Sequence, residues 1–309
     1  FKVKTMNVLI TGGAGYIGTA LCQALQANPA VEKVIIYDNL SRHNYNLLIG
    51  AQKLDNRFQF IEGDILDSRN LRKAVRKSDV VFHLAAKVTT PFADQDAHLF
   101  EQVNHWGTAE LSYAVEESDV KKLVYLSSVS VYGSGEEAKD INAPKNPRTF
   151  YGISKMRGEE HISRLSDKLE TSIFRCGNVY GYNKSMRFDA VINKFMFEAN
   201  FHNKINVNGT GDQHRPFIFI DKVAEVLNRV LESDALVGTH NLVEHNFSVN
   251  EIVGVVKELY PELEMIFINH NMKLRELQVD PSKGNVIPVS EGTDLLKTRL
   301  ESFKASFSF

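Results

Sequence analysis

A glycine-rich turn near the N-terminus constrains the fold of this chain more than any other feature. Residues 11–18 read TGGAGYIG and continue directly from Asn7–Thr11, an apolar, β-branched run typical of a strand buried on both faces. A helix-like segment follows the turn. Gly12, Gly15 and Gly18 have a spacing that suits a tight turn, close backbone approach to a pyrophosphate and close helix–strand packing. The segment therefore predicts the start of a dinucleotide-binding βαβ unit.

The rest of the first half alternates short apolar runs with amphipathic stretches. Further strands are expected at Lys33–Tyr37, Phe58–Glu62, Val80–Leu84, Lys122–Ser127 and Thr171–Arg175. Helices are expected at Gly15–Ala27, Ser68–Lys77, Ala93–Glu117 and Gly152–Asp167. Strand–helix alternation of this kind predicts an α/β fold with a Rossmann-type, doubly wound parallel sheet and helices on both faces.

The regular alternation of strands and helices ends after Gly181. Helices are expected at Asp189–Asn200, Lys222–Glu232 and Ser248–Tyr260, the last of which begins with a capping box formed by Ser248 and Glu251. Strands are expected at Lys204–Val207, Phe217–Ile220 and Thr239–Val243. We expect residues 1–180 to form the nucleotide-binding domain and 181–309 mainly a smaller C-terminal α/β lobe that binds substrate, with 213–245 partly returning to the first domain. The tail from Asn271 carries fewer signals.

Composition excludes several classes of protein. The 36 Lys and Arg against 38 Asp and Glu give a net charge of −2, which argues against a nucleic-acid partner. Cys22 and Cys176 fit a reducing compartment and are too few for a four-cysteine zinc site, so no metal is expected. No apolar run approaches the roughly 20 residues of a membrane span, and the N-terminus leads straight into a strand. These features predict a cytoplasmic protein with no membrane partner.

Acidic residues end the second and third predicted strands. Asp38 lies 20 residues beyond Gly18, where a carboxylate accepts hydrogen bonds from adenosine ribose hydroxyls and repels a 2′-phosphate, so it favours NAD over NADP. Arg42 follows soon after and weakens that argument. A solvated Asp at the start of a turn is the alternative interpretation. Asp64 could accept from the adenine amino group, and small residues in 83–87 (HLAAK) would let a cofactor lie close to the backbone.

A tyrosine and a lysine four residues apart, Tyr151 and Lys155, share one face of a predicted helix. A nearby ammonium stabilises phenolate, so we expect the pKa of the tyrosine to fall from about 10 toward neutrality. Such a tyrosine can move a proton on a sugar hydroxyl while a hydride leaves its carbon. The YxxxK spacing alone is common by chance. Ser128 and Ser130 strengthen it, because they leave the fifth strand at the sheet edge where such folds bind ligands.

Together these motifs resemble the extended short-chain dehydrogenases/reductases of the NAD-dependent nucleotide-sugar epimerase/dehydratase family. The matching segments are TGGAGYIG at 11–18, YDN at 37–39, GDI at 63–65, HLAA at 83–86, NHWGT at 104–108, SSVSVYG at 127–133, YGISK at 151–155, FRCGNVYG at 174–181 and GTGDQHRPFIFID at 209–221. They cover about residues 6–221 in the family's order, and the stretch from about 245 matches only loosely. The resemblance implies a bound NAD cofactor, a nucleotide-diphosphate sugar substrate and a homodimer formed through Ala93–Glu117 and Gly152–Asp167.

The family's residue roles transfer by position. By that resemblance the catalytic residues are Ser128, Tyr151 and Lys155. Cofactor contacts would be made by Gly12, Gly15, Tyr16, Ile17, Gly18, Asp38, Asn39, Asp64, Ile65, Leu84, Ala85, Ala86, Asn104, Tyr151 and Lys155. Substrate contacts would be made by Lys87, Ser128, Ser130, Asn178, Arg215 and Arg275. Asn178 and Arg215 would hold the diphosphate, since a guanidinium suits phosphate oxygens. A surface ion pair is the alternative for Arg215.

The residues after Ser128 separate the family's reactions. The 4,6-dehydratases resemble T-D-E-V-Y-G, and Val129 and Ser130 occupy the positions of their two acids. Decarboxylases of the group carry a Glu where this chain has Ser130. We therefore expect an NAD-dependent C4 epimerase that works through a 4-keto sugar, with Tyr151 as acid/base. An NAD(P)-dependent nucleotide-sugar reductase or dehydrogenase remains open, as does a non-catalytic NAD-binding sensor. Pro216 and Phe219 depart from the family's polar pattern, and Ser185–Asn193 lacks the longer insertion of the UDP-galactose epimerases. Together these features argue against UDP-galactose as the sugar nucleotide, but not against the family.

Overall fold

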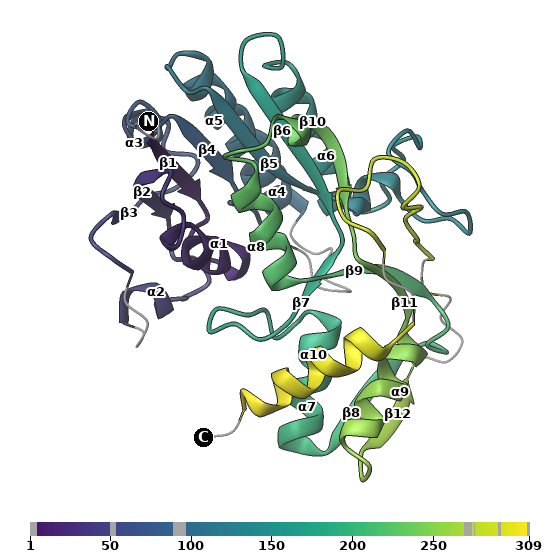
Figure 1. Ribbon diagram of the computed structural model, residues 1–309. Helices are drawn as coiled ribbons and strands as arrows, with labels where there is room; N and C mark the ends of the chain where they lie inside the picture. Colours follow the sequence, from purple (N-terminus) through teal and green to yellow (C-terminus); the bar gives the residue numbers. More distant parts are fainter. Residues whose placement is uncertain are drawn as a thin grey trace.

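A seven-stranded, wholly parallel sheet forms the centre of the larger part of the molecule (Figure 1). The computed structural model describes residues 5–49, 54–88, 97–268, 274, 276–289 and 292–307. The sheet has the order β10-β6-β5-β4-β1-β2-β3. Its strands are β1 Met6–Thr11, β2 Val31–Asp38, β3 Phe58–Glu62, β4 Val80–His83, β5 Lys122–Ser128, β6 Glu170–Cys176 and β10 Gly238–Leu242. The predicted Rossmann-type sheet is confirmed.

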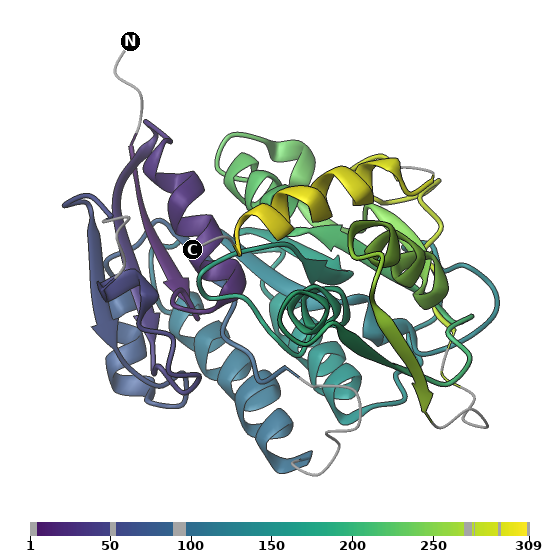
Figure 2. The ribbon, with the colours of Figure 1, turned by 90° about the horizontal axis from the view of Figure 1, so that it is seen from below.

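Helices cover both faces of this sheet because its strands bury side chains on both sides. Val8 and Ile10 of β1 pack with α1 and α8, whereas Leu9 packs on the opposite face with α3, α5 and α6. Figure 2 shows the two helical layers on opposite sides of the strands. These helices are α1 Tyr16–Gln26, α3 Ser68–Val75, α5 Gly107–Glu116, α6 Phe150–Ser163 and α8 Ile220–Arg229.

The helix expected at Ala93–Glu117 is not a uniform α-helix. Residues 93–96 lie outside the described ranges, and the described part begins with α4, Ala97–Phe100. It then widens into a π-helical segment, η2 Glu101–Trp106, before continuing as α5. A π-helix hydrogen-bonds five residues apart and is often found at functional sites. The wide turn includes Asn104, one of the predicted cofactor residues.

The second lobe begins where β6 runs on into β7, beyond the carboxyl ends of the central strands (Figure 1). One small sheet has the order β11-β9-β7, and β8 pairs with β12 in another. The elements are β7 Asn178–Tyr180, α7 Val191–His202, β8 Lys204–Asn208, β9 His214–Phe219, β11 His245–Ser248, α9 Val249–Leu259, β12 Glu264–Ile268 and α10 Asp294–Ala305. Short elements elsewhere are α2 Asn46–Ile49, η3 Val129–Tyr132 and η4 Asp234–Leu236.

Several boundaries in this half differ from those expected. The strand expected at 217–220 is β9, which starts at His214 and therefore includes Arg215. Helix α8 starts at Ile220, two residues before its expected start. The capping box of Ser248 and Glu251 is confirmed at the start of α9. The strands β7 and β11 are only three and four residues long and contain polar residues, which hides them in the sequence. The strand β12 is an apolar run of ordinary length that was not predicted.

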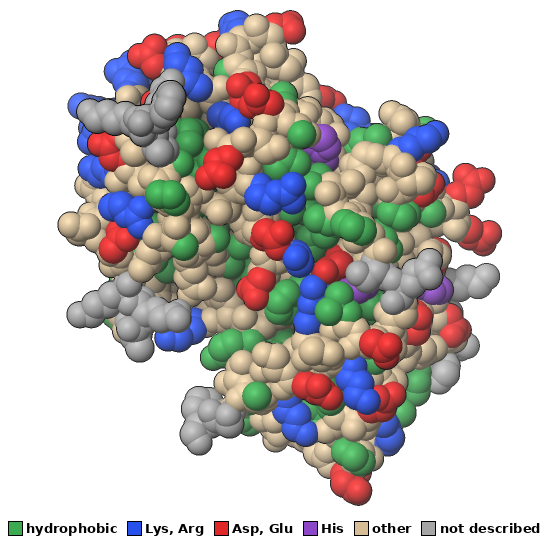
Figure 3. Space-filling view, viewed as in Figure 1, with side chains coloured by type: hydrophobic (Ala, Val, Ile, Leu, Met, Phe, Trp, Pro, Cys, Tyr) green, Lys and Arg blue, Asp and Glu red, His purple; other side chains and the backbone are tan. Residues whose placement is uncertain are grey.

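The face of the molecule in Figure 3 carries acidic and basic side chains interspersed over both lobes. This distribution agrees with the near balance of charges in the sequence. Within the described ranges, no helix has the length and apolar character needed to span a bilayer. Across the same residues, no three His, Cys, Asp or Glu side chains are grouped as metal ligands.

Candidate active site

The glycine-rich turn fits against the loop that follows β4. Gly12 has φ +74°, and a β-carbon there would lie 2.5 Å from the backbone nitrogen of Ala85. A β-carbon at Gly18 would lie 2.5 Å from the carbonyl oxygen of Gly12. Gly15 caps α1 without any side-chain hydrogen bond, so the first turn presents backbone N–H groups and the positive end of the helix dipole. This arrangement fits the pyrophosphate of a dinucleotide.

Asp38 joins this turn to the end of β2. Its Oδ2 accepts from the backbone nitrogen of Ala14 at 3.0 Å and its Oδ1 from that of Leu40 at 2.8 Å. Burial raises the pKa of Asp38, and the two backbone hydrogen bonds act in the opposite direction. Each carboxylate oxygen retains a further lone pair for a ribose hydroxyl. Arg42 lies 3.7 Å from Asp189, so its guanidinium pairs with the second lobe.

Replacing Asp38 by Asn is expected to weaken NAD binding by about tenfold or more, because a hydrogen bond to a charged group is worth about 1.5–3 kcal/mol. The same variant should also lose much of its discrimination against NADP, since the charge that repels a 2′-phosphate is gone. Calorimetric titration with both dinucleotides measures both effects. Asp55→Asn, which removes a carboxylate paired with Arg57 in a neighbouring loop, is the matched control. An unchanged ratio of affinities in D38N would contradict the assignment.

Other residues of the predicted cofactor set lie at the carboxyl edge of the central sheet, and they differ in how far they are exposed to solvent. Asn39 Nδ2 donates to Asp64 Oδ2 at 2.8 Å, which brings the ends of β2 and β3 together. Ile65 is 6% exposed and packs in the core against α5. The loop after β4 carries the half-buried Leu84, Ala85 and Ala86. The structure therefore gathers these positions at the carboxyl ends of β2, β3 and β4.

The side chains of Tyr16 and Ile17 point away from the turn. Tyr16 donates its hydroxyl to the carbonyl of Gly181 at 2.5 Å and accepts from Asn193 Nδ2 at 3.4 Å. The ring packs in the core of the second lobe, and Ile17 contacts both hydrophobic cores. These two side chains fasten the lobes together, so only their backbone atoms lie at the helix N-terminus.

Asn104 ties the loop after β4 to α6. Its Oδ1 accepts from the backbone nitrogen of Lys87 at 2.8 Å, and its Nδ2 donates to the carbonyl of Lys87 at 2.9 Å and to Ser154 Oγ at 3.0 Å. Ser154 precedes Lys155, so Asn104 connects the loop after β4 to α6 directly beside the lysine. Lys87 itself is exposed beyond its backbone contacts.

The three predicted catalytic residues meet at the end of β5. Ser128 is the last residue of β5, and its hydroxyl, which donates to Ser130 Oγ at 3.1 Å, lies close enough to Tyr151 in the first turn of α6 to act on the pKa of the phenol. One turn further, Lys155 donates Nζ to the carbonyl of Leu126 at 2.7 Å. The same ammonium lies 4.6 Å from the centroid of the Tyr125 ring. A hydroxyl, a phenol and an amine therefore converge on one point of the sheet edge.

The prediction that the pKa of Tyr151 falls toward neutrality is wrong. Burial raises the pKa of Tyr151, and this outweighs the opposing effects of the Ser128 hydroxyl and of the charge of Arg187. Burial also lowers the pKa of Lys155 to about 7. The lysine donates to Leu126 rather than to the phenol oxygen. The physical reason is that the site removes both groups from water, which disfavours a charge on either.

The turn after Ser128 carries no acid at positions 129 and 130. Val129 is 3% exposed and packs with Val243, Leu277 and Val279. Ser130 is half-buried, and its backbone nitrogen and hydroxyl contact Ser128 Oγ at 3.2 and 3.1 Å. A carboxylate at position 129 would therefore lie in an apolar cluster.

Two of the three predicted substrate residues beyond residue 170 lie on the small sheet of the second lobe. Asn178 of β7 donates Nδ2 to the carbonyl of Pro216 at 3.0 Å. Arg215 precedes that proline on β9 and donates to the carbonyl of His214 at 2.8 Å. The structure thus brings Asn178 and Arg215 onto adjacent strands. Arg275 lies outside the described residues.

Sequence reasoning missed one charged residue of the site, Arg187. It lies in the loop between β7 and α7, and it pairs with Asp189 at 2.5 Å. Its positive charge acts on Tyr151. No periodicity or spacing in this loop distinguishes Arg187 from a surface arginine, because the approach of the loop to α6 is a property of the tertiary structure.

Comparisons with known proteins place this geometry in a family. The NAD dependent epimerase/dehydratase family matches residues 8–243. A dTDP-D-glucose 4,6-dehydratase of Bos taurus is 31% identical over 84% of this chain and 75% of its own length. A protein of Methanocaldococcus jannaschii described as a putative UDP-glucose 4-epimerase is 31% identical over 81% of each chain.

Solved structures show the same fold across nearly the whole chain. The UDP-N-acetylglucosamine 4-epimerase of Methanobrevibacter ruminantium superposes with a TM-score of 0.85 over 98% of both chains at 24% identity. The UDP-glucuronic acid 4-epimerase of Bacillus cereus, solved with UDP-glucuronic acid and NAD, gives 0.82 over 97% of this chain and 98% of its own at 26% identity. The glycine-rich turn, the Ser–Tyr–Lys group and these matches agree: the chain is an enzyme of the NAD-dependent epimerase/dehydratase family, of the extended short-chain dehydrogenase/reductase type.

Proposed function

We propose that this enzyme is a nucleotide-sugar 4-epimerase. The observation that carries the proposal is the Ser128, Tyr151 and Lys155 group followed by two positions without a carboxylate, Val129 and Ser130. Such a site can hold and move one proton on a sugar hydroxyl. It offers neither the acid nor the base that elimination across C5 and C6 needs at these positions.

In this mechanism Tyr151 acts as its phenolate: it takes the proton of the C4 hydroxyl as the hydride leaves C4 and later returns that proton. Burial favours the neutral phenol, and the positive charges of Arg187 and of oxidised nicotinamide, when bound, favour the phenolate. The Ser128 hydroxyl, beside the tyrosine, would hydrogen-bond the sugar oxygen and orient the sugar hydroxyl toward the phenolate. NAD, when bound, supplies the acceptor and then the donor of the C4 hydride. The 4-keto sugar turns over between the two transfers, so the hydride returns to its other face and the C4 configuration inverts.

The substrate in this proposal is a nucleotide-diphosphate sugar. Residues 1–180 would hold the cofactor and the second lobe the sugar nucleotide, with Asn178 and Arg215 on its diphosphate. Named epimerases occur among both the relatives and the solved structures. Dehydratases also occur among the relatives. We favour an epimerase over a dehydratase because Val129 and Ser130 lack a carboxylate.

The proposed assembly is a homodimer that pairs through α5 and α6. Trp106, Tyr113 and Phe150 lie on or beside these helices and are 54%, 43% and 47% exposed. Large aromatic side chains exposed on the surface are enriched at interfaces between subunits.

The test is product analysis on a panel of UDP- and dTDP-linked sugars with substoichiometric NAD. We expect conversion of one substrate to its C4 epimer, with no net change in absorbance at the wavelength of reduced nicotinamide. A 4-keto-6-deoxy product would overturn the proposal in favour of a dehydratase. Stoichiometric consumption of NADH or NADPH would identify a reductase. Tight NAD binding without turnover of any sugar would indicate a sensor.

A further inference from the structure

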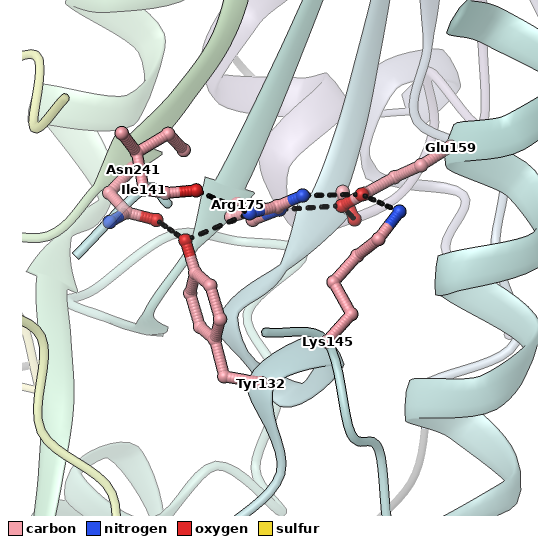
Figure 4. Close-up of polar contacts among 7 residues, drawn as sticks. Tyr132, Ile141, Lys145, Glu159, Arg175 and Asn241 are labelled. Carbon is pink, nitrogen blue, oxygen red and sulfur yellow. Dashed lines mark hydrogen bonds and ion pairs between the residues drawn. The ribbon is translucent and has the colours of Figure 1, made fainter. Parts of the chain in front are cut away.

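We propose that Glu159 is a positioning residue for the reaction: with Arg175 it holds the Ser128–Ser130 segment against the catalytic helix and places a negative charge one turn from Lys155. The inference rests on the proposed function, since it assigns a role in the chemistry of the same site. Figure 4 shows the residues that carry it.

Glu159 and Arg175 form an ion pair in the interior. Their side chains are 2% and 8% exposed. Arg175 donates Nε to Glu159 Oε1 at 3.0 Å and its terminal nitrogen to Oε2 at 2.9 Å, so the contact is bidentate. Glu159 Oε1 also accepts the hydroxyl of Ser127 at 2.6 Å. Lys145 approaches Oε2 from the exposed side at 3.4 Å.

The other end of the guanidinium holds the far side of the serine turn. Arg175 donates to the hydroxyl of Tyr132 at 3.0 Å and to the carbonyl of Ile141 at 3.2 Å, and it lies over the Tyr132 ring. Tyr132 in turn donates to Asn241 Oδ1 at 2.6 Å on β10. These contacts join η3 to β6 and β10, as the dashed lines in Figure 4 show.

The contacts hold the catalytic serine from both ends of its turn. Ser127, bonded to Glu159, immediately precedes Ser128, and Tyr132, bonded to Arg175, ends the turn. Glu159 belongs to α6, the helix of Tyr151. The distance between the Ser128 hydroxyl and the Tyr151 phenol is therefore set through Glu159, and a misplacement of about 1 Å at such a site can cost about 100-fold in rate.

The charge of Glu159 also acts on the lysine. The groups facing Lys155 are His83 from β4, Tyr125 from β5, Glu159 from α6 and Cys176 from β6. Burial lowers the pKa of Lys155, and Glu159 is the largest influence that opposes it. Removing Glu159 would lower this pKa further, so the ammonium would be lost at a lower pH.

A role in folding alone explains the pair poorly. Replacing a buried ion pair by apolar side chains of similar volume is often neutral or stabilising, whereas removing one partner is strongly destabilising. A fully buried pair beside a reactive lysine and serine therefore points to a role in the site. It also means that the double replacement Glu159→Leu/Arg175→Met is the variant expected to fold.

The experiment compares this double variant with the wild type by steady-state kinetics across pH. We expect kcat to fall by about 100-fold with KM for the sugar nucleotide nearly unchanged. The alkaline limb of the pH profile should move down by about one pH unit, because a charge lost beside Lys155 lowers its pKa. Should the double variant fail to fold, Ser127→Ala removes the bond to Glu159 and keeps the ion pair. Its expected loss in kcat is about tenfold, and an unchanged kcat in S127A would overturn the proposal.

The control is Lys122→Met/Glu170→Leu. This variant removes an ion pair of 2.9 Å between the first residues of β5 and β6, at the end of the sheet away from the site. Its pH profile should match the wild type. Lysine-selective ¹³C NMR, with Lys155→Met for assignment, titrates the ammonium directly and needs no substrate. A Lys155 pKa and a kcat unchanged in the double variant would overturn the inference. Absence of sugar turnover by the wild type would overturn the proposed function, while the NMR titration still tests the effect of Glu159.

Discussion

Replacing Tyr151 by Phe is expected to reduce kcat by about 10²- to 10⁴-fold, the usual contribution of one general acid/base. The phenylalanine ring keeps the edge-on contact with Phe100, whose centroid lies 6.2 Å away, so the packing of α6 is preserved. What is lost is the oxygen that Ser128 contacts and that carries the proton of the sugar hydroxyl. The measurement is the initial rate of C4-epimer formation at saturating sugar nucleotide.

The interpretation of Y151F depends on a cofactor site that stays intact. NAD affinity, followed by the fluorescence of the single tryptophan, should fall by no more than about tenfold, because the variant removes at most one hydrogen bond to the cofactor and the pyrophosphate contacts lie at the glycine-rich turn. Tyr113→Phe is the matched control, since that ring is exposed on α5. Full activity of the Tyr151 variant would remove the tyrosine from the mechanism.

Replacing Arg299 by Ala is expected to lower the free energy of unfolding by about 3–5 kcal/mol, the cost of leaving a buried charge unpaired. Arg299 of α10 contacts both oxygens of Glu244 at 2.5 and 2.7 Å, and the side chains are 11% and 5% exposed. The guanidinium also lies 4.4 Å from the Phe219 ring and donates to Tyr180 at 3.0 Å. Urea denaturation measures the loss.

Two further variants make this prediction specific. Arg164→Ala removes a half-exposed ion pair to Glu116 and should cost at most about 1 kcal/mol. Arg299→Met/Glu244→Leu removes both buried charges and should recover most of the stability. If R299A were no less stable than R164A, the ion pair would not hold α10 on the second lobe.

The pair also has a pH dependence with a defined sign. Burial raises the pKa of Glu244, but the hydrogen bonds and charge of Arg299 outweigh it and hold that pKa below its usual range. A carboxylate with a lowered pKa in the folded state stabilises above its unfolded pKa and loses that contribution as pH falls through the folded value. The difference in free energy of unfolding between wild type and the double variant should therefore be constant above the usual pKa of a glutamate. Below that pKa, the wild type should lose stability relative to the double variant as the pH falls.

Local sequence patterns predicted the first half of the molecule well. The strands of the central sheet are short apolar runs between glycine-rich or polar turns, and burial on both faces is the reason that these runs are continuous. The glycine-rich turn was also predictable, since a β-carbon at Gly12 or Gly18 would collide with backbone atoms and the sequence must keep glycine there. The differences in this half are the widened helix at η2 and the strand β7, which is three residues long and was not predicted.

The candidate site was predicted as a set of residues, but its interactions were not. Lys155 was expected to act on the Tyr151 phenol, and it donates instead to Leu126. Tyr16 was expected at the cofactor, and its side chain fastens Gly181 of the second lobe. In both cases the partner lies far away in the chain and its direction depends on packing.

The sequence by itself determined the fold class and the family, and it predicted a set of residues for the cofactor edge, because these depend on strand periodicity, glycine spacing and motifs within single loops. Only the tertiary structure decided how the site is electrostatically arranged and held. Burial of Tyr151 and Lys155, the approach of Arg187, the Glu159–Arg175 pair and the attachment of α10 through Arg299 all join elements remote in sequence. Desolvation and ion pairing depend on which atoms surround a group in space, and no local pattern records that.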